Sequence, residues 1–435
     1  GMTLNLNGKA LNNQAGLVSS QQALNVNASS INNQAGSIET AGALGLISAG
    51  QLNNTGGRMV GNGITFNTQS VNNQGGNVIS NAGLSIQNSA DFNNNKGYVY
   101  ANTGIGITAK NITNTEGTIK SLGKIDLQAA NQLDNSKGWI GSNADVTLKA
   151  NKVINNGTLD ANNIAMGIQG NNVSVTTQNL DNIGGKIIAT DKAALLVENQ
   201  INNQKGSISS DGQIIIQKSD GTAMALVDNR DGSIVAKDNT IFKTKQVLND
   251  GGELVFGDNL SLDIAGDYTQ TGVLQAGNDA NITIGGHLTN EGTLEAQNNL
   301  NLKANDLTNM DDAKIVAGQN TNIDVKNTIN NYGLIDGTNT TIHTSKLNNE
   351  GEKARIYGTH LAIEADEINN KASDRNGDGM LGAGAIAARD RLDIGAKTIL
   401  NEEDALIYSD GSVHIGGKLD ANKHATGMAD SITNS

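Results

Sequence analysis

Short runs in which apolar and polar residues alternate recur along the whole chain. They include Leu4-Asn5-Leu6, Leu24-Asn25-Val26 and Ile64-Thr65-Phe66 near the start, and Leu300-Asn301-Leu302 further on. A period of two puts every second side chain on one face, as in a β-strand with one buried face. No stretch sustains the 3.6-residue period of an amphipathic helix. The pattern predicts an all-β protein.

Each alternating run is followed by a turn that carries an asparagine, and this row repeats about every 20 residues, a period typical of solenoids. A glycine follows the asparagine two or three residues later in most rows, as at Gly97 and Gly117, and a β-branched or aliphatic residue comes next. The series continues to Asn401, and Gln270 breaks it. The asparagines of the first rows are Asn13, Asn33, Asn54, Asn73, Asn94, Asn114, Asn135, Asn155, Asn182 and Asn203.

One row is too short to bury its apolar face alone, so successive rows must stack and pair their strands. We therefore expect a right-handed parallel β-helix, because parallel connections are overwhelmingly right-handed. It should have about 20 residues per coil and about 20 coils, continuous over residues 1–435. The asparagines should stack from coil to coil as an amide ladder. Asparagine and glycine should occupy the left-handed or tight-turn positions. In one row, Ile201 should point inward and Lys205 outward.

Three intervals between asparagines are longer than the others, so extra residues must leave the coil as loops. These loops are expected near residues 160–172, 217–224 and 371–384. Loops on solenoids are either uncommitted insertions or the places where binding specificity is located. The segment 350–435 is more charged than the rows before it, and four of the six arginines lie in it.

The composition fits continuous strand stacking and excludes several classes of protein. The chain has no proline, which would remove ladder hydrogen bonds, and only 3% aromatic residues. Without cysteine there is no disulfide or thiolate metal site. A net charge of −13 opposes binding to nucleic acid. No apolar run reaches the roughly 18 residues that cross a bilayer, so the chain is not expected to span a membrane.

The third loop contains the sequence DRNGDG at residues 374–379. Alternating acidic and amide side chains with glycine at the turn are typical of calcium loops with oxygen ligands, here Asp374, Asn376 and Asp378. The closing glutamate of an EF-hand is missing, because Ala385 takes its place. The segment is thus either a looser calcium site or a solvated polar turn, and we expect no other cofactor.

The pattern predicts no catalytic centre. Paired carboxylates would be needed for a β-helix lyase or glycosidase, and the outward acids of the alternating strands lie several coils apart. The histidines show no metal-binding spacing, and His343 and His414 should be solvated. A polysaccharide lyase or hydrolase remains the less favoured alternative. The outward acids are Asp126, Asp263, Asp324 and Asp393.

The rows resemble the haemagglutinin repeats of filamentous haemagglutinin and of contact-dependent growth inhibition effectors, the large exoproteins of two-partner secretion. The resemblance covers essentially the whole chain. It is most specific in GDYTQTG at residues 266–272 and in the segment from Ile386 to Asn434, IAARDRLDIGAKTILNEEDALIYSDGSVHIGGKLDANKHATGMADSITN. That second segment is similar to one that closes the first haemagglutinin repeat region in these effectors.

The resemblance implies a stretch of a secreted exoprotein, exported unfolded through an outer-membrane transporter and folded outside the cell into a surface filament. It implies a stalk that presents an adhesin or a growth-inhibition toxin to neighbouring or host cells. A target-cell receptor would be the second partner, contacted through the loops. The alternative is a module that itself binds a receptor or glycan. The sequence does not distinguish an adhesin from a toxin-delivery parent.

Overall fold

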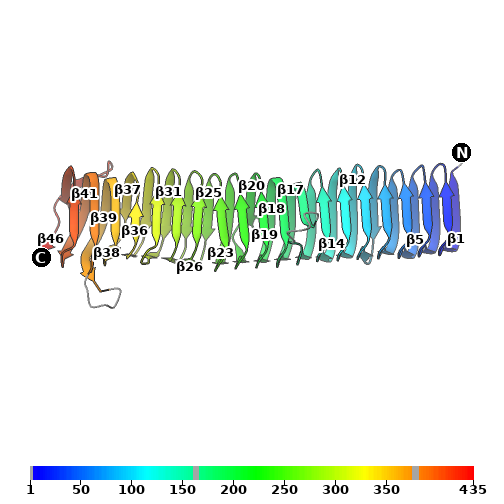
Figure 1. Ribbon diagram of the computed structural model, residues 1–435, viewed down its shortest axis with the longest axis horizontal. Coiled ribbons are helices and arrows are strands. Elements are labelled where there is room, and N and C mark those ends of the chain that lie inside the picture. The colour runs from blue at the N-terminus through cyan, green and yellow to red at the C-terminus, as the bar shows by residue number, and fades with distance from the viewer. Residues whose placement is uncertain (1–2, 160–165, 375–381) are drawn as a thin grey trace. The chain divides into compact units, whose positions relative to one another are not determined.

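The computed structural model describes residues 3–159, 166–374 and 382–435. All regular elements in these residues are strands, with no helix among them. The chain divides into two units, residues 1–233 and 234–435, and each unit is a parallel β-solenoid (Figure 1). About 21 residues form each turn of the solenoid, and there are about 19 turns. The predicted all-β solenoid fold is confirmed.

The strands of the first unit are β1 (Leu4–Asn12), β2 (Leu17–Ser20), β3 (Leu24–Asn32), β4 (Ser37–Thr40), β5 (Leu44–Asn53), β6 (Arg58–Gly61), β7 (Ile64–Asn72), β8 (Asn77–Ser80), β9 (Gly83–Asn88), β10 (Phe92–Asn93), β11 (Tyr98–Ala101), β12 (Gly104–Thr113), β13 (Thr118–Ser121), β14 (Lys124–Asp134), β15 (Trp139–Ser142), β16 (Val146–Ile154), β17 (Gly167–Asp181), β18 (Lys186–Asn202), β19 (Ser207–Ser210), β20 (Gln213–Gln217) and β21 (Met224–Asp228).

Strand β22 (Ser233–Ala236) begins at the last residue of the first unit. It is followed by β23 (Thr240–Leu248), β24 (Glu253–Phe256), β25 (Leu260–Ile264), β26 (Tyr268–Gln270), β27 (Val273–Ala276), β28 (Ala280–Ile284), β29 (His287–Asn290), β30 (Thr293–Ala296), β31 (Asn299–Ala304), β32 (Asp306–Asn309), β33 (Lys314–Ala317), β34 (Asn320–Val325), β35 (Thr328–Asn331), β36 (Leu334–Asp336), β37 (Asn339–His343), β38 (Lys346–Glu350), β39 (Arg355–Ser373), β40 (Gly382–Ala383), β41 (Ala385–Glu402), β42 (Leu406–Ser409), β43 (Ser412–Gly416), β44 (Lys418–Leu419), β45 (Ala425–Thr426) and β46 (Ser431–Asn434).

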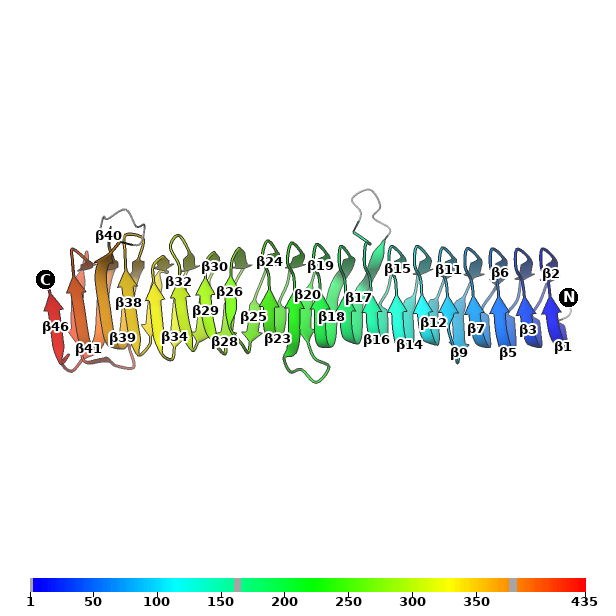
Figure 2. The ribbon, with the colours of Figure 1, turned by 90° about the horizontal axis from the view of Figure 1, so that it is seen from below.

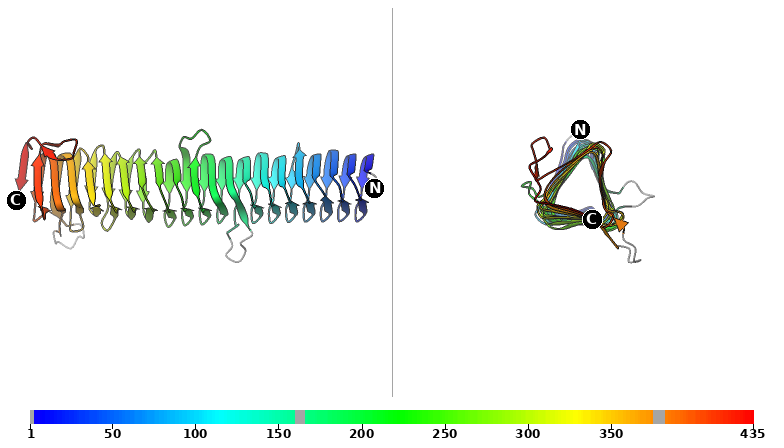
Figure 3. Two further views of the ribbon diagram at one scale, coloured as in Figure 1. Left: turned by 90° about the horizontal axis from the view of Figure 1, so that it is seen from above. Right: turned by 90° about the vertical axis from the view of Figure 1, so that its left-hand side faces the viewer.

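The strands of the coils pair in parallel with the equivalent strands one coil later, and the pairs β39–β40 and β44–β45 are antiparallel. In the first unit Leu4 pairs with Leu24, Leu24 with Leu44, and Leu44 with Ile64. Short strands such as β2, β6, β11 and β15 form one side of this unit, and the longer strands form the other sides (Figure 2). Seen end-on, a coil has three sides (Figure 3). The backbone hydrogen bonds run from coil to coil, which explains why a chain without proline suits this fold.

The interior of each unit is filled by columns of apolar side chains. Ile86, Ile107, Leu127 and Leu148 succeed one another in register, with at most 1% of each side chain exposed. All four phenylalanines of the chain are inward and buried, two in each unit. Stacking like on like packs the interior without gaps, so the apolar contacts are equivalent from one coil to the next.

The structure corrects the bounds of the three loops. The first ends before Gly167, because β17 begins there, and residues 160–165 lie outside the described range. The second covers residues 218–223 only, between β20 and β21. In the third, β39 continues to Ser373 and pairs antiparallel with β40, so strand residues occupy both ends of the expected loop. Sequence spacing located the insertions but not the points at which the strands end.

The structure also corrects the role of the repeated glycine. In most coils the left-handed conformation belongs to the residue before it, which is a non-glycine residue such as Lys96 with φ of 56° or Glu116 with 55°. In other coils a glycine does take that conformation, as at Gly75 with φ of 62° and Gly157 with 64°. Gly97 is required by close packing instead. A Cβ there would lie 2.4 Å from the carbonyl oxygen of Asn73 and 2.5 Å from Oδ1 of Asn94. The glycine leaves room for the asparagine column, and the left-handed position of the turn is taken by an ordinary residue in some coils and by a glycine in others.

Candidate functional site

The repeated asparagines of the first unit form a continuous column of buried amides. The Nδ2 of Asn13 donates to Oδ1 of Asn33 at 2.7 Å, and Asn33 donates in the same way to Asn54. Most of these amides also donate to the carbonyl of the glycine three residues later. Bonds of 2.6–2.8 Å continue through Asn73, Asn94, Asn114, Asn135, Asn155, Asn182, Asn203 and Asn229. The column satisfies polar groups inside the solenoid and holds adjacent coils in register.

A second column runs along the outer surface of the first unit, at the corner where the first long side of each coil ends. Register pairs Asn7 with Asn27, Asn27 with Ile47, and Ile47 with Asn67, and the series continues coil by coil. All of these side chains are exposed except Thr176, which is half-buried. The outer column consists of Asn7, Asn27, Ile47, Asn67, Gln87, Thr108, Gln128, Lys149 and Thr176.

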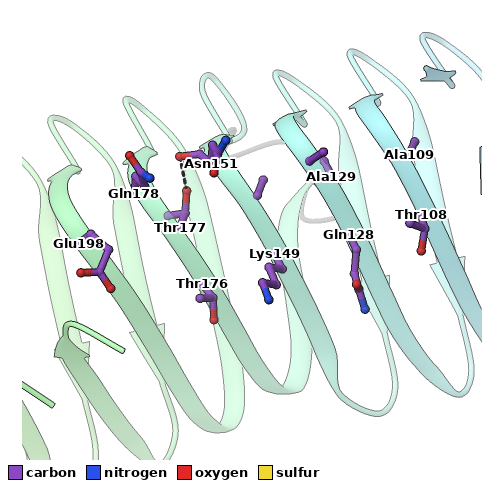
Figure 4. A pocket seen from close by; sticks show the side chains of 12 residues that line it. Thr108, Ala109, Gln128, Ala129, Lys149, Asn151, Thr176, Thr177, Gln178 and Glu198 are labelled. Atoms are coloured by element: carbon purple, nitrogen blue, oxygen red, sulfur yellow. Dashed lines mark hydrogen bonds between the residues drawn. The ribbon is translucent and has the colours of Figure 1, made fainter. Parts of the chain in front are cut away.

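This outer column forms one wall of a groove whose floor consists of small residues. From the second coil onward, the residue after each outer side chain is buried at the corner, as with Ala109, Ala129 and Ala150. The chain then turns into a second wall, which includes Asn151 and Gln178. In Figure 4 the side chains of both walls follow one another across successive strands, and Thr177 donates a hydrogen bond to the carbonyl of Asn151. We call this feature, from Asn7 to Glu198, the corner groove.

Three hollows make up the corner groove, with volumes of about 470, 510 and 410 Å³. The first two share Ser48, Ala49 and Asn67, and the last two share Thr108. They are therefore successive parts of one depression. At its far end Glu198 accepts a 2.7 Å hydrogen bond from Oγ of Ser219, which lies in the second insertion. One of the predicted loops is thus anchored at the end of the groove.

The second unit contains a cluster of charged side chains beneath its last residues. A hairpin of β44 and β45 lies against Gly395 and Gly416, where a Cβ would be 2.4–2.5 Å from its backbone. Asp393 is only 3% exposed and is paired with Arg391 at 2.5 Å. The N–H of Ala425, in the hairpin, donates to Asp393 at 2.8 Å. A groove of about 330 Å³ beside this cluster is also lined by His360, Lys423 and His424.

Asp393 points outward, as expected from the alternation, but it is buried, because the hairpin folds back over it. The structure also places Asp393 and Asp324 in different outward columns. Asp393 pairs with Ala362 and His414, whereas Asp324 pairs with His343 and Glu364 in another column. His343 is exposed, with Nδ1 3.0 Å from Asp324. The remaining charges near the end pair across coils, as in the 2.6 Å contact of Lys397 with Asp366.

The hairpin should loosen in acid. Burial by itself raises the pKa of Asp393, but the hydrogen bonds from Arg391 and the Ala425 N–H, with the charges of Arg391 and His414, lower that pKa below its ordinary value. The stabilisation is therefore present above the ordinary carboxyl pKa, about 4, and is lost as pH falls through the depressed value. Pepsin cleavage within residues 418–428 should rise steeply below about pH 4. Asp393→Asn should be cleaved readily at pH 5 already, and an identical pH profile in both proteins would contradict this role of Asp393.

Comparison with models of known families identifies the repeat. The family model described as haemagglutinin repeat matches the chain eight times, at residues 3–56, 60–129, 129–167, 168–218, 223–292, 255–312, 296–372 and 360–435. The chain belongs to the haemagglutinin repeat family. No curated protein and no solved structure matches it. In the described part of this haemagglutinin repeat chain, no helix is long and apolar enough to cross a membrane. The family is one of structural and adhesin proteins, which is consistent with a non-enzymatic role.

In the segment GDYTQTG, two core residues of the second unit differ together from their counterparts in the next coil. Tyr268 is 2% exposed and pairs with Leu288, so it takes a leucine position. Its hydroxyl donates to Oε1 of Gln270, which is fully buried and pairs with Asn290 of the asparagine column. Burial raises the pKa of Tyr268, which keeps the hydroxyl protonated as a donor. The longer glutamine thus reaches the hydroxyl that the tyrosine brings into the core.

This pair predicts a non-additive result. Gln270→Asn alone should destabilise by about 1–3 kcal/mol, because the buried hydroxyl of Tyr268 loses its acceptor. The double change Tyr268→Leu with Gln270→Asn should recover most of the loss, since it recreates the row found at Leu288 and Asn290. Melting temperatures of the four proteins form a double-mutant cycle. Additive losses would mean that the two residues do not act as a pair.

The expected calcium loop lies mostly outside the described residues. Asn376 and Asp378 fall in 375–381, and Asp374 is at its edge. Among the described residues no group of three or more His, Asp or Glu side chains is arranged to hold a metal ion. Calcium binding therefore stays a prediction. Calorimetry should show binding that disappears in Asp374→Ala with Asp378→Ala, and heat that is absent or insensitive to this double change would make the loop a plain turn.

An aromatic strip on the short strands of the first unit was missed from the sequence. Tyr98 and Tyr100 of β11 stack with ring centroids 6.3 Å apart. Two coils further on, the only tryptophan, Trp139, lies over Gly141, and Nζ of Lys120 is 4.9 Å from its ring centre. The signal was available, because an aromatic-poor chain places three aromatic residues at outward positions of short strands within 42 residues. Tyr98 and Trp139 are at equivalent positions, and Tyr100 is at the next outward position of its strand.

Proposed function

We propose that this chain is a stalk segment of a secreted bacterial surface exoprotein. The observation that supports this is the uniformity of the coils: the same hydrogen bond joins each ladder residue to the next from Asn13 to Asn229, and again from Asn290 to Asn434. Coils that are interchangeable add length without adding a new site. The haemagglutinin repeat match over nearly all residues supports a filamentous, adhesin-like role.

The stalk would hold a terminal module away from the bacterial surface, and that module would be an adhesin or a growth-inhibition toxin. Export would use an outer-membrane transporter of the two-partner type, and the chain would fold after leaving the cell. The lack of cysteine fits this route, because no disulfide has to form or break during passage. A receptor on the target cell would be the second partner, contacted through the loops of this chain.

Surface labelling of intact cells tests the proposed location and route. Antibodies raised against this chain should label cells that produce the parent protein, and labelling should disappear when the transporter gene is deleted. Protein that is synthesised but never labelled on intact cells would refute a surface stalk. Labelling that is unchanged without the transporter would leave the surface location standing but refute the two-partner route.

A further inference from the structure

We propose that the corner groove binds a linear, neutral polysaccharide, with the glycan lying across successive coils. This binding function is additional to the stalk function and does not depend on it. The side-chain amides of Asn7, Asn27, Asn67 and Gln87 are exposed and make no hydrogen bond to any described residue. In contrast, at the neighbouring outward position Asn25 donates to Asn5 at 2.9 Å. The groove therefore offers donors and acceptors that are available to a ligand.

The chemistry of the walls selects against other polymers. From Asn7 to Thr108 the outer column contains no charged residue, and the charges further along are those of Lys149 and Glu198. A phosphate backbone requires clustered Lys and Arg, which the groove lacks. A protein partner requires a desolvated apolar or aromatic anchor, and the outer column supplies only Ile47 as a large apolar side chain. Amides and hydroxyls over a floor of small residues suit a ligand whose surface is mainly hydroxyl groups.

The geometry of the groove suits an extended chain. Equivalent side chains recur once per coil, at the strand spacing of about 4.8 Å, which is close to the length that one sugar ring adds to an extended glycan. Successive sugars would meet the same surroundings in successive coils, so weak contacts would add along the polymer. An extended peptide cannot add as a strand here, because the backbone groups at the walls already pair between coils.

The second unit provides an internal comparison. Its equivalent column, the outward residue before the buried corner residue, consists of Asp263, Thr283, Lys303, Asp324, His343 and Glu364. The corner behind it includes Ile264 and Ile284 as well as the smaller Ala304 and Ala365. The long uncharged part of the outer column, from Asn7 to Gln128, is thus a feature of the first unit and not a consequence of the repeat itself.

The second insertion limits the groove at one end. Oγ and N–H of Ser219 both lie within hydrogen-bond distance of Glu198, and Asp220 holds the loop through Thr222 at 2.6 Å. A loop fixed at this point would contact the end of a bound polymer, which agrees with the general location of specificity in solenoid loops.

Affinity electrophoresis of the whole chain tests the proposal. Native gels would contain mixed-linkage β-glucan, hydroxyethylcellulose or galactomannan as neutral polymers, and polygalacturonate as an acidic one. We expect retardation by at least one neutral polymer and none by polygalacturonate. The triple variant Asn67→Ala, Gln87→Ala and Gln128→Ala should bind at least about tenfold more weakly, because three hydrogen-bonding side chains are lost. These residues are exposed, so folding should not change, as circular dichroism can verify.

The matched control removes three exposed amides at the opposite turn: Gln14→Ala, Gln34→Ala and Gln74→Ala. This variant should be retarded like the unchanged chain. Equal losses in both triple variants, or none in the first, would place the binding elsewhere and overturn the proposal. It would also be overturned if no neutral polymer retards the chain, or if polygalacturonate alone does. None of these results bears on the surface labelling that tests the stalk.

Discussion

Replacing Ile201 with aspartate should cost about 4 kcal/mol or more, because an unpaired charge enters a dry interior and an apolar side chain is lost. Ile201 is fully buried in β18, between Leu180 of the previous coil and Val227 of the next. Its replacement affects both interfaces, so the coils on either side lose their packing together. We expect a large fall in melting temperature, followed by circular dichroism, and protease cleavage close to position 201.

Lys205→Asp is the matched control in the same row. Lys205 is exposed, with φ of 54°, in the left-handed conformation that aspartate tolerates better than most residues. Its backbone N–H bonds to the carbonyl of Arg230 at 3.1 Å, and the substitution keeps that bond. The change should be within about 0.5 kcal/mol of zero. Similar losses of melting temperature for Ile201→Asp and Lys205→Asp would show that the assignment of inward and outward faces is wrong.

The row pattern was enough to predict the fold because inward and outward positions follow from period two at every coil. Ile201 and Lys205 lie on the sides that the alternation assigned to them. The asparagines were placed for a similar reason: they recur at one position of the row, and stacked rows bring equivalent positions together. These inferences use only relations that repeat, and a repeat makes long-range contacts visible as sequence spacing.

Features that depend on a single long-range contact could not be read in this way. The alternation puts Asp393 outward, as observed, but its burial depends on Ala425, 32 residues later and outside the row pattern. The role of Gly97 depends on Asn73 in the previous coil, which resembles a turn requirement when only the local sequence is considered. The calcium residues Asn376 and Asp378 fall outside the described chain, so their prediction is neither supported nor contradicted.

The corner groove could be predicted from the sequence only in part. Its columns were visible as outward residues such as Gln87 and Gln128, each followed by a residue that is buried at the corner. What the sequence did not show is that the backbone turns there, so that small residues such as Ala109 and Ala129 leave a depression instead of a flat surface. A neutral outward column next to a run of alanines is the signal that could have identified it.

Removing residues 74–114 should leave a folded solenoid that is two coils shorter. Asn73 and Asn114 are equivalent ladder residues, so the deletion joins Asn73 to Thr115 and lets Asn73 bond to Asn135 in place of Asn94. Val78, which pairs with Met59, is replaced by Ile119, and both are fully buried. The new neighbours are apolar where the old ones were, so we expect paired strands and a melting temperature within a few degrees of that of the full chain.

Because the chain has no cysteine, Gln34→Cys and Lys205→Cys introduce unique positions for spin labels on exposed sites of the first unit. The distance between the labels should shorten by two strand spacings, roughly 10 Å. Removing residues 74–84 instead deletes only about half a coil and joins Asn73 to Ser85. Ser89 and Asp91 then fall at the inward positions that Val78 and Ser80 occupy. The deletion buries polar and charged side chains in the apolar interior, so the protein should unfold or aggregate.

In the parent protein the two-coil deletion distinguishes a stalk role of these coils from a role as a recognition surface. If the coils serve as length, the shortened protein should still be exported and bind its target, with activity that depends on reach. The deletion also removes Gln87, Asn88, Ser89, Thr108 and Ala109 from the corner groove, but it joins two stretches of the same outer column and leaves a shorter groove of the same kind. An exported, folded two-coil deletion that no longer binds its target would show that this regular stretch is itself the recognition surface, and the stalk proposal would then be abandoned.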